Sequence, residues 1–553
     1  MTFLNISPNK PLNKPSFVFG IMILVVIGYF AYRDIKDYMD VILWDEGEYL
    51  KNGLLFMKKI PKTWGPLYSG WYFVLHLLEH DTLQLYFLNY RILSVLPIVL
   101  FFCFLQLRGI HFSVSLLISM SWMLSSINIA VWPMISHLCI SIVLLGCILG
   151  SFFNKQSLKY LVFTMTALFV SYARPEYYFS FIVLFIVCIL FCWKERKQIT
   201  SLNKYSIVIG MLMVVLVHKV MGISILQDKR GLLALTQHFM YNYNLWHHIN
   251  EPWWICWYDR LNEIFNHPKS ILHAFNDHPD MFHKHVYSNV VNYIILVWKK
   301  IGGIILFSTI FKVHGLLKMI VVGLVVLMSF LVGKHLNVKF SLRKNVRKFA
   351  SVWLLLFMFV FPSLISSIIV FPREHYFVLQ IPFILFVMLS VLDFQIPPNR
   401  FYKSLVIIFS ICILLFGPNA KNFKYFNLFN LKDEGAYVKD VIIYLKDADI
   451  KEEVNLLENE GGITYLLTPN YTWCRGFGDA ESWNAFQKEK NINMIYVSSF
   501  LEQNRFKLDD SWSEFIQNPE QHGFVKIKTG RYEPYLLMSK ELYATIDHKR
   551  IKK

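Results

Sequence analysis

The sequence lacks the motifs that mark several common protein classes. Its eight cysteines include no C-x-x-C pair, which excludes the metal and redox motifs built on that spacing. It has no internal repeat and no low-complexity tract. Its apolar segments are long and continuous, unlike the short alternating strands of a transmembrane barrel. The first apolar run, residues 17–32, has no small-residue cleavage site after it, so we expect a retained anchor rather than a removed signal peptide.

Apolar residues, in contrast, are abundant. Hydrophobic residues make up 55% of the 553 positions and the mean hydropathy is +0.41, which is too apolar for a soluble protein of this size. Many runs approach the roughly 20 residues needed to cross a bilayer, where only helices or closed barrels satisfy the backbone. The sequence therefore predicts a polytopic α-helical membrane protein.

The charge balance predicts how the chain is oriented. The net charge is +17, and many Lys and Arg residues fall in short loops between apolar runs, the pattern of cytosolic loops. This accounts for the basic balance without a nucleic-acid partner, and it places the N-terminal segment in the cytosol. Six cysteines lie in apolar runs as small buried residues, whereas Cys256 and Cys474 fall in expected outer parts, where a pairing is open.

We expect about eleven membrane spans and a separate C-terminal domain. The spans are residues 17–32, 85–107, 112–131, 134–153, 161–173, 178–193, 206–221, 316–332, 352–370, 376–392 and 405–416. Two long outer loops cover residues 33–84 and 222–287, and short helices are expected at 49–57 and 71–78. Residues 290–298 are interpreted as an amphipathic approach helix, and the region of Gly302 and Gly303 as partial or re-entrant.

The transmembrane module thus covers residues 1–418, and residues 419–553 are expected to form a soluble extracytoplasmic α/β domain. Strands are predicted at residues 454–457, 464–467 and 494–497, after a helix at 437–446. Asp479, Glu481 and Trp483 could contact carbohydrate or form an ordinary polar loop.

The acidic stretch Trp44-Asp45-Glu46-Gly47-Glu48-Tyr49 lies just past the first apolar run. A carboxylate near hydrocarbon is costly to keep ionised, so acids in this position are often functional. We interpret Asp45 as a general base that takes a proton from a hydroxyl group. The alternative is a solvated loop that happens to be acidic.

Cationic residues are expected at the same outer boundary of the membrane. They are Lys58, Lys59, Lys62, Arg91, Arg174 beside Glu176, and Arg373 beside Glu374 and His375. Each alone is explained by a long side chain reaching from a helix end to water. Together with the acids, they supply what transfer from a phosphate-linked donor needs, because Arg and Lys neutralise the departing phosphate.

Four motifs resemble those of GT-C glycosyltransferases, in the branch with protein O-mannosyltransferases and lipid A aminoarabinose transferases. They are Trp44-Asp45-Glu46-x-x-Tyr49; Lys62-x-x-Gly65-Pro66-Leu67-Tyr68 with Trp71; Asn89-Tyr90-Arg91-Ile92-Leu93-Ser94; and Phe371-Pro372-Arg373-x-x-Tyr376-x-x-x-x-Ile381-Pro382. The chain departs from that branch in two places. Glu374 and His375 separate Arg373 from Tyr376, and Arg174 stands where the branch often has a lysine.

The resemblance implies sugar transfer from a polyprenyl-phosphate donor to a lipid, glycan or protein acceptor outside the cytosol, with inversion at the anomeric carbon. It implies catalytic roles for Asp45 and Glu46. The implied substrate and phosphate contacts are Lys62, Arg91, Arg174, Glu176, Arg373, His375 and Tyr376. With no secretory pattern of paired cysteines, it favours a bacterial inner membrane, with the active site and C-terminal domain on the periplasmic side.

Three matters stay open at the level of sequence. No metal site is assigned, although Asp45-x-x-Glu48 can hold a divalent cation, and the histidines of residues 222–287 match no closed zinc pattern. A transporter or flippase of a lipid-linked substrate is one alternative function, but it predicts polar groups near the middle of the membrane. A non-catalytic assembly subunit is the other, and it predicts that Asp45 is dispensable.

Overall fold

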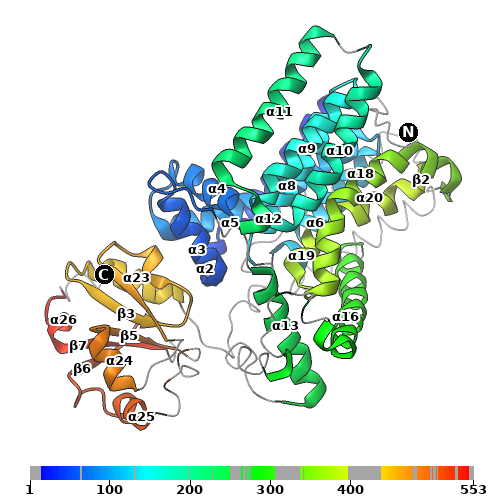
Figure 1. Cartoon of the computed structure of the whole chain (residues 1–553). Coiled ribbons are helices and arrows are strands. Elements are labelled where there is room, and N and C mark those ends of the chain that lie inside the picture. The colour runs from blue at the N-terminus through cyan, green and yellow to red at the C-terminus, as the bar shows by residue number, and fades with distance from the viewer. Residues whose placement is uncertain are drawn as a thin grey trace. The chain divides into compact units, whose positions relative to one another are not determined.

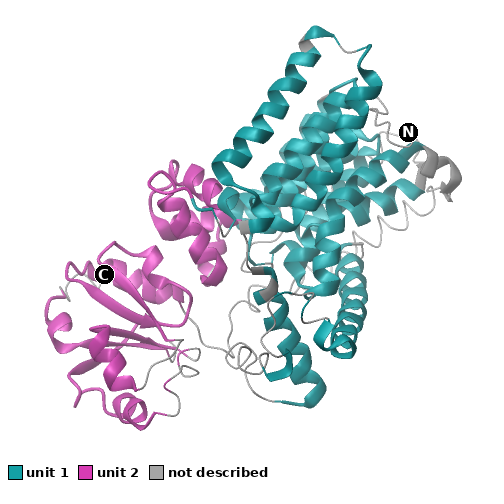
Figure 2. Ribbon diagram, viewed as in Figure 1, with its two compact units in different colours: residues 1–32, 61–68, 91–422 teal, residues 33–60, 69–90, 423–553 magenta. Residues whose placement is uncertain are grey.

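The computed structural model describes the chain in two compact units (Figure 2). Unit 1 comprises residues 1–32, 61–68 and 91–422, and unit 2 comprises residues 33–60, 69–90 and 423–553. Within these, the described residues are 14–62, 65–129, 132–198, 200–227, 230–249, 263–265, 270, 273, 276–305, 337–340, 342–395, 438–476, 482–498, 501, 506, 509–529 and 534–546. The predicted spans at 316–332 and 405–416 and the predicted domain boundary at residue 418 lie outside them.

The described part of unit 1 is almost entirely helical. Its helices are α1 (Lys14–Tyr32), α6 (Phe112–Met123), α7 (Ser126–Ile129), α8 (Ile135–Gly150), α9 (Gln156–Ser171), η2 (Pro175–Tyr177), α10 (Tyr178–Glu195), α11 (Ser201–Met221), α12 (Ser224–Gln227), α13 (Arg230–His247), α16 (Pro279–Ile305), α18 (Leu342–Ile369), α19 (Glu374–Val378) and α20 (Ile381–Val391). It also contains most of α5 (Thr82–Leu107) and a short antiparallel pair, β1 (Asn337–Phe340) and β2 (Leu392–Gln395). Helix α9 packs between α8 and α10, and α18 packs against α10, α16 and α20 (Figure 1).

Five helices of the described chain are long and apolar enough to cross a membrane. They are Pro15–Asp37, Thr82–Leu107, Pro175–Glu195, Asn203–Leu226 and Lys348–Ile369. Four of them, all but Thr82–Leu107, carry large exposed apolar side chains; on α11, for example, Val208, Ile209, Leu212, Val215 and Leu216 are all exposed. Such surfaces are normal in lipid and unusual in water.

The helices match most of the predicted spans, with three differences. The run 112–131 is divided into α6 and α7, and the hydroxyl of Ser125 bonds the carbonyl of Trp122 between them at 2.7 Å. The run 376–392 is divided into α19 and α20, because Pro382 has no N–H to continue the helix from Val378. The approach helix predicted at residues 290–298 is part of a longer helix, α16, which runs from Pro279 to Ile305 and includes Gly302 and Gly303.

A proline inside α18 is accommodated by a neighbouring helix. Pro362 lacks the N–H that would bond the carbonyl of Met358 four residues earlier. The hydroxyl of Ser180 on α10 donates to that carbonyl at 2.6 Å. An unsatisfied carbonyl is expensive away from water, so this bond lets α18 remain continuous through the proline.

Unit 2 joins helices of the N-terminal part to an α/β domain. The former are α2 (Ile35–Tyr38), α3 (Trp44–Leu54), most of α4 (Pro66–His76) and the start of α5. The latter has β3 (Val454–Glu458), β4 (Tyr471–Arg475), β5 (Met494–Val497), β6 (Phe524–Lys528) and β7 (Tyr535–Ser539), with α23 (Val438–Ala448), η5 (Ile463–Leu466), α24 (Trp483–Glu489), α25 (Asp510–Gln517) and α26 (Lys540–Ala544).

The sheet of unit 2 has the strand order β4-β3-β5-β7-β6. Strands β3, β4 and β5 are parallel, with Val454 opposite Tyr471 and Leu456 opposite Met494, whereas β7 is antiparallel to both β5 and β6. Burial on both faces explains the continuous apolar sequence of β5, and β3 is also largely buried. Both strands were predicted. An aromatic core that includes Trp483, Phe506 and Phe515 covers one part of the sheet.

The strand predicted at 464–467 is wrong. Gly461 and Gly462 adopt left-handed backbone angles, φ +92° and +108°, and turn the chain directly after β3. The amide of Tyr465 then bonds the carbonyl of Gly462 at 3.0 Å, which begins the 3-10 helix η5. Only glycine reaches such angles readily, so the turn overrides the strand preference of the apolar residues that follow.

Candidate functional site

The acidic stretch is the first turn of a helix rather than a loop. Helix α3 begins at Trp44, whose φ is +38°, and Asp45 and Glu46 lie in its first turn, where carboxylates favour the helix dipole. The two acids differ in environment. Asp45 is partly exposed, whereas Glu46 has only 1% of its surface exposed.

Glu46 is held by a buried network in unit 2. Its carboxylate accepts hydrogen bonds from the hydroxyl of Tyr72 at 2.5 Å and from Nδ2 of Asn89 at 3.1 Å. The Oδ1 atom of Asn89 accepts in turn from the indole of Trp71 at 2.8 Å. Three residues of separate sequence motifs, Glu46, Trp71 and Asn89, are thus brought together, and they fix α3 relative to α4 and the start of α5.

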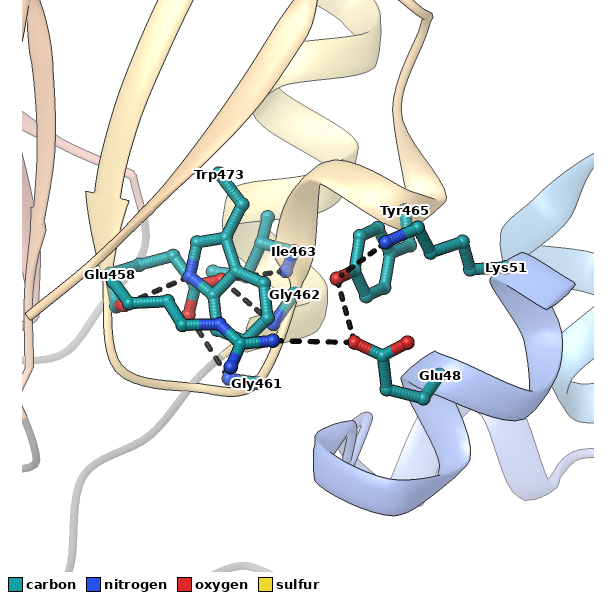
Figure 3. Close-up of polar contacts among 9 residues, drawn as sticks. Glu48, Lys51, Glu458, Gly461, Gly462, Ile463, Tyr465 and Trp473 are labelled. Atoms are coloured by element: carbon teal, nitrogen blue, oxygen red, sulfur yellow. Dashed lines mark hydrogen bonds and ion pairs between the residues drawn. The ribbon is translucent and has the colours of Figure 1, made fainter. Parts of the chain in front are cut away.

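The third acid of the stretch, Glu48, contacts the α/β domain. The hydroxyl of Tyr465 donates to Glu48 at 2.9 Å, and Nζ of Lys51 donates to the same hydroxyl at 3.1 Å (Figure 3). The guanidinium of Arg475 lies 3.4 Å from Glu48 and stacks on Trp473. Tyr465 and Arg475 were missed from the sequence, because they lie more than 400 positions from Glu48 along the chain.

Three further carboxyl groups lie near this contact. Glu458, at the end of β3, accepts from the backbone N–H groups of Gly461 at 3.1 Å, Gly462 at 2.7 Å and Ile463 at 3.1 Å (Figure 3). It also accepts from the N–H group of Glu460. Burial raises the pKa of Glu458 to about 7 although these donors oppose the shift, and burial raises the pKa of Glu460 to about 8. Asp40, whose pKa is raised by burial to about 6, accepts from the N–H groups of Val438 and Lys439 at the start of α23.

The guanidinium of Arg174 lies in unit 1 among polar and aromatic side chains. The residue follows α9, and its Nη2 atom donates to the hydroxyl of Ser136 at 3.0 Å. Its guanidinium stacks on the ring of Tyr376 at 4.6 Å, and the carboxylate of Glu176 lies 3.9 Å away. The structure therefore brings together three residues predicted for the site, Arg174, Glu176 and Tyr376. A stacked guanidinium keeps its charge.

Arg373 and His375 flank the start of α19. Arg373 is the N-cap residue and is partly buried, and the buried ring of His375 packs on that of Tyr376 at 4.4 Å. Burial, and secondarily the charge of Arg373, lowers the pKa of His238 to about 2, which places Arg373 near α13.

The remaining predicted cations have different surroundings. The Nε atom of Arg91 donates to the carbonyl of Tyr32 at 3.2 Å, at the C-terminal end of α1, a contact that favours a cation through the helix dipole. Lys62 is exposed. Both belong to unit 1 with Arg174 and Arg373, whereas Asp45 and Glu46 belong to unit 2.

The histidine-rich residues 222–287 contribute to a buried network that the sequence did not reveal. Buried His285 lies within hydrogen-bond distance of Asn242, Asn289 and the carbonyls of Ile369 and Val370 at the end of α18. Burial lowers the pKa of His285 to about 4, so the ring is neutral at pH 7. The role of His285 is therefore to hydrogen-bond the backbone carbonyls at the C-terminal end of α18.

No group of three His, Cys, Asp or Glu residues arranged for a metal ion occurs in the described part of the chain. Cys474 is a buried free thiol, and Cys256 lies outside the described residues. Of the three residues considered for carbohydrate contact, Trp483 is in the core of the sheet domain, and Asp479 and Glu481 lie outside the described residues.

Comparison with known proteins gives no further assignment: no family model and no curated protein matches the chain.

Proposed function

We propose that the protein is a membrane glycosyltransferase that moves a sugar from a polyprenyl-phosphate donor to an acceptor hydroxyl outside the cytosol. Asp45 is its general base. The proposal includes about eleven spans and an extracytoplasmic C-terminal domain. It also includes a bacterial inner membrane as the location and a lipid, glycan or protein as the acceptor.

The observation that carries the proposal is the contrast between the two acids at the start of α3. Glu46 is buried and accepts two hydrogen bonds, so its position is fixed. Asp45, next to it on the same helical turn, is partly exposed. A partly exposed carboxylate on an anchored helix suits a general base, because a base must be held within hydrogen-bond reach of the proton that it accepts.

The chemistry requires a base and a cationic group. The acceptor O–H gives its proton to the Asp45 carboxylate, and the acceptor oxygen forms a bond to the anomeric carbon. The bond from that carbon to the phosphate oxygen breaks on the opposite face, and polyprenyl phosphate leaves with the electron pair. Arg174, supported by Ser136 and Tyr376, offers the positive charge that such a leaving group needs.

The surface of unit 1 supports placement in a membrane. Exposed apolar side chains on α1, α10 and α11 would face lipid, and the five long apolar helices have the required length. A lipid-linked donor is reached most directly by an enzyme embedded in the same bilayer.

The test is transfer of labelled sugar from a polyprenyl-phosphate donor pool in membranes that contain equal amounts of wild type or Asp45→Asn. Asp37→Asn is the matched control, because Asp37 is an exposed acid on the neighbouring α2. We expect loss of transfer with Asp45→Asn alone. Equal transfer by all three proteins would remove Asp45 from catalysis, and no transfer by any of them from a wide donor panel would favour a transporter or a non-catalytic subunit.

A further inference from the structure

We infer that residues 458–466 of the α/β domain position the catalytic turn of α3, with Tyr465 as the positioning residue for Asp45. The inference rests on the proposed function in naming Asp45 as the base. It adds a role for the C-terminal domain, which holds the turn of α3 that presents this carboxylate. All of the contacts that carry it lie within unit 2.

The first contact is between two backbones. A Cβ atom at Gly461 would overlap the backbone N and Cα atoms of Trp44, the residue that begins α3. On the other side, a Cβ atom at Gly47 would lie 2.9 Å from the carbonyl oxygen of Gly461. Two glycines therefore allow the loop to lie directly against the turn that contains Asp45.

The second contact is polar and reaches the following turn of α3. The Tyr465 hydroxyl donates to Glu48 and accepts from Lys51, and Nζ of Lys51 also lies 4.4 Å from the centre of the tyrosine ring (Figure 3). Because Glu48 and Lys51 are one turn apart, a single hydroxyl fixes both the position and the rotation of the helix. Rotation of α3 would redirect Asp45.

The loop itself is rigidly defined. Four consecutive N–H groups point to the carboxylate of Glu458, so the conformation of residues 460–463 is set by one buried side chain. Further bonds join the same two parts of unit 2: Asp40 to the start of α23, Lys446 to Asp81 at 2.7 Å, and the hydroxyl of Thr82 to the carbonyl of Leu466 at 2.6 Å. The α/β domain is therefore hydrogen-bonded to the N-terminal helices of unit 2 at several positions, and not only at α3.

The experiment compares Tyr465→Phe with a matched control in the full-length membrane protein. Tyr465→Phe removes only the hydroxyl. Tyr471→Phe is the control, since Tyr471 is buried in the same domain and its hydroxyl has no hydrogen-bond partner among the described residues. We expect Tyr465→Phe to lower kcat about tenfold with little change in the acceptor KM, because small misplacements of a catalytic group are costly.

The decisive arm is the double variant. If Tyr465 acts through Asp45, Tyr465→Phe has no further effect on the residual transfer of Asp45→Asn. Losses that multiply in the double variant would overturn the inference, as would a Tyr471→Phe loss equal to that of Tyr465→Phe.

A second measurement does not depend on transfer. The thiol introduced by Asp45→Cys is labelled with a water-soluble maleimide, and its rate is compared with and without Tyr465→Phe. The inference predicts faster labelling when the hydroxyl is absent, and an unchanged rate would refute it even if the donor were wrong. If labelling is faster but transfer does not depend on Asp45, the positioning of α3 by Tyr465 stands and the role of Asp45 as the base is rejected. The two claims can therefore fail separately.

Discussion

The hydroxyl of Tyr72 donates to the buried carboxylate of Glu46 across 2.5 Å, and this bond holds the helix that carries Asp45. We expect Tyr72→Phe to destabilise the protein by about 2 kcal/mol, the typical value for a hydrogen bond to a charged group. The melting temperature in detergent measures this. Tyr90→Phe is the control, because the buried hydroxyl of Tyr90 has no hydrogen-bond partner among the described residues. An equal, small effect of both substitutions would contradict the role given to Tyr72.

The buried acids of unit 2 predict a dependence of stability on pH. Burial raises the pKa of Glu460 from 4.5 to about 8, so the folded state holds this proton more tightly than the unfolded state does. The contribution of protonated Glu460 to the free energy of unfolding is complete below about pH 4.5, and it is lost as the pH rises through about 8. Glu458 and Asp40 act in the same direction.

Labelling of Cys474 measures this effect, because the thiol is buried in the sheet and becomes accessible when the domain opens. Between pH 6 and pH 9, labelling should accelerate more in wild type than in Glu460→Gln, which cannot ionise. Comparing the two proteins at each pH cancels the pH dependence of the thiol itself. Parallel profiles would show that Glu460 does not control opening.

The surroundings of Arg174 lead to a prediction about binding of the donor phosphate. Its stacking on Tyr376 and its bond to Ser136 orient a positive charge, and a lost charge-assisted hydrogen bond is worth about 1.5 to 3 kcal/mol. We therefore expect Arg174→Gln to raise the donor KM by about tenfold or more, and Arg174→Lys to raise it less. Arg196→Gln, on the exposed end of α10, serves as control. A donor KM that Arg174→Gln leaves unchanged would exclude Arg174 from phosphate binding.

The hydrogen bond from Ser180 to the carbonyl of Met358 predicts that the effects of Ser180→Ala and Pro362→Ala on stability are not additive. Ser180→Ala leaves the carbonyl of Met358 without this donor and should lower stability by about 1 kcal/mol. Pro362→Ala restores an N–H that can bond the same carbonyl inside α18. In the Pro362→Ala background, Ser180→Ala should therefore have almost no effect on the melting temperature. Additive effects would mean that the serine stabilises the helices in another way.

The sequence allowed the apolar helices to be predicted because a long apolar run is a local signal. Helices α1, α8, α10, α11 and α18 each contain or closely match a predicted span. Local chemistry also explains where prediction failed. Residues 464–467 have strand-like composition, yet the left-handed Gly461 and Gly462 before them start a 3-10 helix.

The candidate site was only partly predictable, because its contacts join distant segments. The motifs containing Glu46, Trp71 and Asn89 were recognised separately, but no periodicity shows that they share one hydrogen-bond network. Tyr465 has no sequence signal at all, since its relation to Glu48 depends on how the domain packs against α3. The stacking of Arg174 on Tyr376 likewise arises from tertiary packing, in which α19 lies against α8.

The most direct test of the central claim is the single-turnover rate of sugar transfer by Asp45→Asn, measured with donor and acceptor both saturating. A general base contributes about 10² to 10⁴ in rate, so we predict a fall within that range, with donor binding unchanged. A rate within about twofold of wild type would contradict the assignment of Asp45 as the base.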